Sequence, residues 1–218
     1  METHAPDTSD MVAVHRVFRD TLAAAPALIN APAAQESERA ALLANYYSNI
    51  VSFLEVHHEG EDELLYPLLR DRVPDDVQAI EEIAAQHAEV EGLVAASRTA
   101  LAAWSVDPAA GADAAQALRN LVEGLTEHLD DEERAVLPLC AQYLSVAEWG
   151  ALPAHGMSHF AGDKVWLILG LIRERMTQAQ RDEMLAHMPP PAVQMWTGFG
   201  EEAFGRLESE VVGSDGSS

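Results

Sequence analysis

The chain has 218 residues, and its 13 Lys and Arg against 36 Asp and Glu give a formal net charge of −23. Nothing in such an acidic chain supplies a basic face for a phosphate backbone, which argues against a nucleic-acid partner. With 48% hydrophobic and 22% charged residues, the composition is that of a globular protein of one or two domains. The single cysteine, Cys140, excludes an intrachain disulfide and a cysteine-based zinc site.

No stretch of the sequence has the pattern of a targeting or membrane-spanning segment. The first ten residues lack the basic and apolar regions of a signal peptide. The longest dense apolar run, residues 165–172, is too short to span a bilayer. We therefore expect a soluble cytoplasmic protein with a reduced thiol and no membrane span.

The composition and the breaks along the chain predict an all-α fold. Ala, Leu, Glu and Gln dominate, and β-branched residues form no alternating runs. Proline-containing breaks divide the first two thirds into four segments of helical length, over 10–30, 36–71, 75–104 and 112–144. The N-caps expected for three of them are Asp10, Asp75 and Asp113. The short breaks favour an up-down-up-down antiparallel four-helix bundle.

Each of the four segments carries one apolar stripe, with steps of three and four residues that are typical of a bundle seam. A histidine interrupts every stripe, and in the second and fourth segments a glutamate follows it one turn later on the same face. These residues are His15, His57, Glu61, His87, His128 and Glu132. A buried glutamate is costly unless it is paired or bound to a metal, so the stripes predict either satisfied core polar residues or a metal centre.

The positions of the histidines favour the metal centre. In an antiparallel hairpin, two residues at the same height lie symmetrically about the turn. The midpoint of His15 and His57 is residue 36, in the first break. The midpoint of His57 and His87 is 72, and that of His87 and His128 is 107.5, in the second and third breaks. Four histidines are therefore expected at one level of the bundle, with both glutamates one turn away.

An internal repeat points to the same site. Residues 57–68 recur 71 residues later as 128–139, with His-x3-Glu, a second acid and Pro-Leu at matching positions. The two hairpins are therefore expected to be two copies of one metal half-site. The prolines of the repeat, Pro67 and Pro138, are expected to kink or shorten the ends of their helices.

This ordered motif resembles the hemerythrin-like family, also called HHE cation-binding proteins, over about residues 8–144. The resemblance implies a non-haem di-iron centre inside the bundle, with a bridging oxo or hydroxo group. It implies terminal nitrogen ligands at His15, His57, His87 and His128, and bridging carboxylates at Glu61 and Glu132. Four imidazoles and two carboxylates suit iron, manganese or zinc, of which iron best explains a bridged pair. An octahedral iron would keep one position open for O₂, NO or peroxide.

The sequence departs from oxygen-carrying hemerythrins in two places. Those proteins have a second histidine four residues further along the third helix, where this chain has Glu91. They have a bridging aspartate five residues after the last histidine, where this chain has Glu132 at four and Glu133 at five. Glu91 lies on the same side of the helix as His87, so it is either an additional ligand or a solvated carboxylate. His58 points off the stripe and is expected behind the ligands or on the surface.

The last third is expected to be a helical extension over 145–212, followed by a flexible tail over 213–218. Capping boxes begin at Ser145 and Thr177, and helices are expected near 145–151, 158–176, 178–187 and 192–210. The apolar run 165–169 predicts a helix that docks on the bundle or forms a homodimer interface.

Two histidines of this extension, His155 and His159, are spaced four residues apart and could bind a metal. No carboxylate follows them on the pattern of the bundle helices, however. Gly156 between them also favours a loop. The sequence therefore predicts no metal site here.

These features predict a di-iron protein that binds or senses a small diatomic molecule, O₂ or NO. An oxidoreductase that reduces NO or decomposes peroxide on the same centre is the first alternative, and a non-redox metal-binding or regulatory module is the second. The apolar stripes around the site favour a small uncharged ligand. The sequence has no Gly-rich dinucleotide loop and no haem-attachment cysteine pair, so an enzyme would need an external electron donor.

Overall fold

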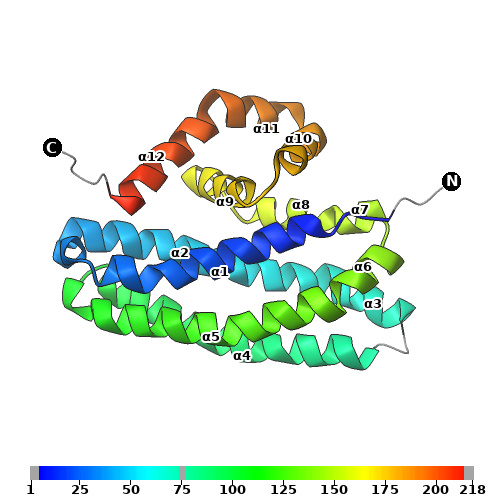
Figure 1. Ribbon diagram of the computed structural model, residues 1–218, viewed down its shortest axis with the longest axis horizontal. Helices are drawn as coiled ribbons and strands as arrows, with labels where there is room; N and C mark the ends of the chain where they lie inside the picture. The colour runs from blue at the N-terminus through cyan, green and yellow to red at the C-terminus, as the bar shows by residue number, and fades with distance from the viewer. Residues whose placement is uncertain (1–4, 74–76, 214–218) are drawn as a thin grey trace.

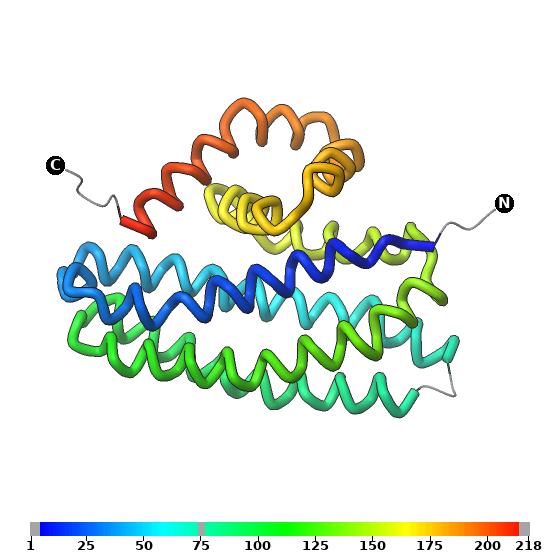
Figure 2. The backbone as a smooth tube through the Cα atoms, viewed as in Figure 1, coloured from blue at the N-terminus to red at the C-terminus, as the bar shows by residue number. Residues whose placement is uncertain are grey.

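The computed structural model describes residues 5–73 and 77–213, and all of its regular elements are helical (Figure 1). Four long helices lie side by side in the N-terminal two thirds (Figure 1, Figure 2). They are α1 (Ser9–Ile29), α2 (Ser37–Gly60), α4 (Val77–Trp104) and α5 (Gly111–Ala135). Short 3₁₀ turns, η1 (Pro32–Gln35) and η3 (Pro108–Ala110), lie in the first and third breaks. None of the described helices combines the length and apolar character needed to cross a membrane.

The second and fourth predicted segments are each interrupted just before their proline. After α2, the chain passes through a π-helical turn, η2 (Glu61–Leu65), into α3 (Tyr66–Arg72). After α5, a break at Val136 leads into α6 (Leu137–Tyr143). Proline has no N–H and its ring crowds the preceding turn, which disfavours an uninterrupted helix at Pro67 and Pro138. The prediction that these prolines kink or shorten the ends of their helices is therefore confirmed for the shortening.

The helix starts differ from the prediction in two of the three expected N-caps. α1 begins at Ser9 with Thr8 as its N-cap, which puts Asp10 in the first turn. α5 begins at Gly111, so Asp113 also lies in a first turn. Both helices start before the first residue of the apolar stripe, so the two aspartates lie inside the helices and not at the N-cap. A carboxylate in the first turn still interacts favourably with the helix dipole. Asp75 lies outside the described residues.

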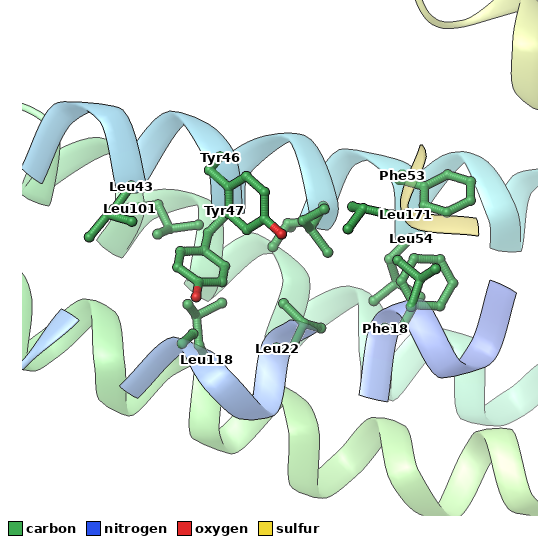
Figure 3. Close-up of a cluster of buried hydrophobic side chains, with 14 of the residues drawn as sticks. Phe18, Leu22, Leu43, Tyr46, Tyr47, Phe53, Leu54, Leu101, Leu118 and Leu171 are labelled. Carbon is green, nitrogen blue, oxygen red and sulfur yellow. The ribbon is translucent and has the colours of Figure 1, made fainter. Parts of the chain in front are cut away.

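The buried side chains form two apolar clusters, one toward each end of the long helices. The larger cluster contains Phe18, Leu22, Tyr47, Leu54 and Leu118, which meet between the helices in Figure 3. The smaller one contains Met11, Leu65, Leu69, Ile83 and Val136. Along each of the four helical segments, the predicted polar residues lie between a member of one cluster and a member of the other. On the second and fourth segments the member of the smaller cluster follows the long helix, at Leu65 in η2 and at Val136 after α5. The stripes therefore place one polar layer between two apolar ones.

The C-terminal extension consists of short helices packed over one side of the bundle (Figure 1). They are α7 (Val146–Trp149), α8 (Ala151–Ser158), α9 (Asp163–Glu174), α10 (Gln178–His187), α11 (Pro190–Met195), the π-helical turn η4 (Trp196–Gly200) and α12 (Glu201–Val212). The predicted capping boxes at Ser145 and Thr177 are confirmed, with both reciprocal hydrogen bonds present. The apolar run of α9 is buried in the larger core cluster, so within this chain it docks on the bundle.

Candidate metal centre

The structure brings all six predicted polar residues together in the layer between the two apolar clusters. His15 comes from α1, His57 from α2, Glu61 from η2 and His87 from α4, while α5 contributes His128 and Glu132. Both glutamates are completely buried, and no histidine of the six exposes more than 9% of its surface. The ring centroids are 5.3 Å apart for His15 and His57, and 4.8 Å apart for His87 and His128.

The potential ligand atoms divide into two groups, in each of which they lie within 4.8 Å of one another. We call them the first and the second ligand set. The first set contains His15, His57, Glu61 and Glu132. The second contains His58, Glu61, His87 and His128. Glu61 belongs to both sets, so its carboxylate lies between two places where a cation could be held.

His58 is a member of the second set that the stripe pattern missed. It is only 5% exposed, and its ring stacks on that of His87 with a centroid separation of 4.2 Å. The expectation that it could lie on the surface is therefore wrong. The internal repeat contained the signal, because the residue 71 positions later is Leu129, which is fully buried.

Glu91 lies elsewhere. Its side chain is exposed on α4, and it belongs to neither ligand set. Of the two interpretations of this residue, the structure therefore favours the solvated carboxylate. The position that carries an additional histidine in oxygen carriers does not reach the layer in this chain.

Buried ligand atoms without hydrogen-bond partners fill the layer. Among the described residues these include the Nε2 atoms of His15, His57, His58 and His128, both oxygens of Glu61, and Oε2 of Glu132. His57 Nε2 and Glu61 Oε1 are 3.1 Å apart, and His15 Nε2 and Glu132 Oε2 are 3.4 Å apart, without hydrogen-bond geometry. Unpaired polar atoms are costly in a protein interior, and cations shared among them would remove that cost. The residues present therefore fit a metal centre.

Residues outside the two sets orient the histidines toward the layer. His15 Nδ1 donates to Glu133 Oε1 at 2.9 Å, and Arg19 donates to the same carboxylate oxygen at 2.6 Å. His87 Nδ1 lies 3.1 Å from Asp62 Oδ1, without hydrogen-bond geometry. A hydrogen-bonded outer partner, as Glu133 is for His15, fixes the tautomer of a ligating histidine and leaves its Nε2 lone pair free. Asp62 and Glu133 are equivalent positions of the internal repeat, so each repeat places a carboxylate against a histidine of the other hairpin.

Tyr66, the first residue of α3, contributes the one hydroxyl group that the described structure places against the layer. Its hydroxyl donates to Glu132 Oε1 at 3.2 Å and lies 3.5 Å from His87 Nε2. Burial and the nearby Glu132 raise the pKa of Tyr66 well above its usual value, so it stays protonated. The equivalent residue of the second repeat is Leu137, so the repeat gave no signal for a hydroxyl here.

Burial is the main influence on the pKa of three histidines and one glutamate of the layer. It lowers the pKa of His57 and His58 well below the usual range, with a further contribution from neighbouring histidines. It also lowers the pKa of His128 to about 4. Burial and the negative charge of Glu132 raise the pKa of Glu61 well above its usual value. These histidines are therefore neutral near pH 7, which is the form that binds a metal.

Comparison with known proteins identifies one family. The model of the hemerythrin HHE cation binding domain matches residues 7–140, which is 134 of the 218 residues and includes both ligand sets. No curated protein and no solved structure matches the chain. The family match covers more than half of the chain, and the buried histidines and glutamates fit a cation-binding role. The chain therefore belongs to the hemerythrin HHE cation binding domain family.

Proposed function

We propose that this chain is a hemerythrin-like non-haem di-iron protein that binds or senses a small diatomic molecule, O₂ or NO. The observation that carries the proposal is the pair of ligand sets that share Glu61. Imidazole and carboxylate ligands of this kind suit iron, and manganese and zinc are the alternatives. Two bound irons with a bridging oxo or hydroxo group would supply an open coordination position for the diatomic ligand.

In this proposal each ligand set holds one iron. His15 and His57 would help to hold the first iron, and His58, His87 and His128 would help to hold the second. Glu61, which belongs to both sets, would serve both irons. Glu132 belongs to the first set, with Oε2 3.4 Å from His15 Nε2 and Oε1 accepting from Tyr66, and its bridging role stays a prediction. His58 extends the predicted ligand list, and Glu91 stays outside it.

The surroundings of the site support a small uncharged ligand. The polar layer is enclosed by the apolar clusters, and the ring of Phe18 lies against His57 with a centroid separation of 5.2 Å. A charged metabolite would lose its hydration in such a place without gaining enough partners, whereas a diatomic molecule would not.

An oxidoreductase that reduces NO or decomposes peroxide is the second candidate, and Tyr66 is the observation that favours it. Its buried hydroxyl carries a proton at the edge of the layer, where a reduced ligand would need one. Such an enzyme would take its electrons from an external donor.

The scaffold that we infer is an up-down-up-down antiparallel bundle over residues 8–144, with a helical extension over 145–212. The order of the two apolar clusters supports it. α1 runs from the smaller cluster at Met11 to the larger at Phe18, and α2 runs back from Leu54 toward Leu65 in η2. The same reversal occurs between α4 and α5. A homodimer through the extension stays a prediction.

Metal analysis of protein produced with abundant iron tests the proposal. We expect about two irons per chain and a visible spectrum that changes on reduction. One tightly held zinc per chain and no iron would contradict the proposal and favour a non-redox module. Rapid mixing of the reduced protein with O₂, NO or peroxide then separates the binding protein, which releases its ligand reversibly, from the enzyme, which turns it over.

A further inference from the structure

A second group of metal-ligating side chains lies outside the bundle interior. It consists of Glu59 on α2, His155 on α8 and His159 just after α8. Their potential ligand atoms lie within 4.8 Å of one another, and the two imidazole ring centroids are 4.5 Å apart. The local sequence of the extension has no carboxylate one turn after these histidines. Glu59 of the neighbouring helix α2 supplies one.

Two local features bring these side chains together. α8 stays helical through Gly156, contrary to the predicted loop, so residues 155 and 159 lie one turn apart on the same side. Gly60 lets α8 approach α2 beside Glu59. A Cβ atom at that position would lie 3.2 Å from both the His155 ring and the Leu152 side chain, closer than packed side chains normally come.

The lone pairs of the group are free to bind a cation. His159 Nδ1 donates to the backbone carbonyl of His155 at 3.0 Å, which leaves Nε2 of His159 as the atom with a lone pair. His155 Nε2 is buried and has no hydrogen-bond partner within the described chain. No Arg, Lys or His of the described residues forms an ion pair with Glu59. A buried imidazole nitrogen without a partner beside a free carboxylate is a combination that a cation would satisfy.

We propose that Glu59, His155 and His159 form a separate site for one divalent transition metal ion of the Zn²⁺ class. Two imidazoles and one carboxylate suit Zn²⁺, Co²⁺ or Ni²⁺, whereas Mg²⁺ and Ca²⁺ take oxygen ligands. Three protein ligands leave the fourth position to water, and exposed Glu59 and His159 admit the ion from solvent. A bound ion joins α8 to α2 immediately before η2, the turn that begins with Glu61.

Titration of the iron-loaded full-length protein with Co²⁺ tests the site. We expect one further equivalent of Co²⁺ to bind, with the strong visible bands of a four-coordinate ion, and the iron content to stay unchanged. Glu59→Gln and His159→Ala should each weaken Co²⁺ binding by at least about tenfold. The matched control is Glu123→Gln, which changes an exposed glutamate of α5 and should bind Co²⁺ like the wild type.

Amide hydrogen exchange supplies a second measurement. Added Zn²⁺ should slow the exchange of α8 amides in the wild type, and it should leave their exchange unchanged in His159→Ala. Equal Co²⁺ binding in all variants would overturn the proposal, and so would Co²⁺ uptake accompanied by iron loss, which would place the ion in the bundle interior. If the purified protein contained no iron but the variants still lost the Co²⁺ site, the proposed function would fail and this inference would stand.

Discussion

Glu61 is the residue on which both ligand sets depend. We expect Glu61→Ala to remove most of the iron, because its carboxylate faces both cation positions. Glu132→Ala should cost roughly half of the iron or more, because Glu132 belongs to the first set only. Exposed Glu91 provides the control, and Glu91→Ala should keep the wild-type iron content. Elemental analysis of the three variants measures their iron content. Loss of iron from Glu91→Ala together with wild-type iron in Glu61→Ala would refute this assignment of the ligands.

Tyr66 offers a test that separates ligand binding from proton supply. Tyr66→Phe keeps the ring and removes the hydroxyl that contacts Glu132, so the iron content should not change. If the hydroxyl provides a proton, the reduced variant should oxidise in oxygenated buffer roughly tenfold more slowly than the wild type. Tyr47→Phe, in the larger apolar cluster, is the matched control. Stopped-flow spectroscopy measures the rates, and equal rates in all three proteins would remove Tyr66 from the chemistry.

The residue pattern predicted the six residues of the layer because histidines recur symmetrically about the breaks. It did not predict Tyr66, since nothing in the spacing distinguishes a tyrosine that reaches the layer from one in the apolar core, such as Tyr47. His58 was within reach of the sequence through its repeat partner, Leu129. Spacing can also suggest a ligand that does not reach the layer. Glu91 lies one turn after buried His87 on the same helix, yet its side chain is exposed.

The contact between the start of α1 and α7 makes the fold sensitive to pH. Burial raises the pKa of Asp10 to about 6 from 3.8, although Met11 N–H and Trp149 Nε1–H donate to it. The folded state therefore holds its proton more tightly than the unfolded state does. The free energy of unfolding must fall as pH rises from about 4 to about 6, and the contribution is lost above that range.

Asp10→Asn should remove this dependence, because the amide stays neutral. Relative to the variant, the wild type should lose up to about 3 kcal/mol between pH 4 and pH 7, from the difference between 6 and 3.8 in pKa. Denaturant unfolding at both pH values measures it. Asp113→Asn changes an exposed residue near the start of α5, so it is the control and should follow the wild type. Parallel pH profiles for Asp10→Asn and the wild type would contradict the prediction.

The elements were predictable to the extent that their signals are local. Capping boxes at Ser145 and Thr177 require only residues three apart, and both form. The π-helical turn at Glu61 has no such local signal. The chain must accommodate Pro67 and also keep the Glu61 carboxylate in the core, and the second requirement depends on the neighbouring helices. α8, which stays helical through Gly156, packs on α2 at Gly60 through Leu152 and His155, and a local pattern does not contain that contact.

For the whole molecule, the main prediction is that metal removal loosens the bundle. Without cations, the layer leaves several buried nitrogens and oxygens without partners between two packed apolar clusters. Metal binds the folded chain and not the unfolded one, so its removal should lower the melting temperature by several degrees. Calorimetry of the holo and chelator-treated protein at pH 7.5 checks this. Glu61→Ala, which we expect to hold little iron, should respond much less to the chelator. Identical melting of both wild-type forms would contradict the prediction.

The divergence of the two repeats makes the two ligand sets chemically different. The second repeat has leucine at the positions of His58 and Tyr66. The first set therefore has two imidazoles and the second has three, and the Tyr66 hydroxyl lies between Glu132 of the first set and His87 of the second. With iron in both sets, the metal with more carboxylate oxygen around it would hold the ferric state more strongly. Addition of one electron would then give a mixed-valence pair with the ferrous ion localised in the second set, and Mössbauer spectra would contain two distinct doublets rather than one.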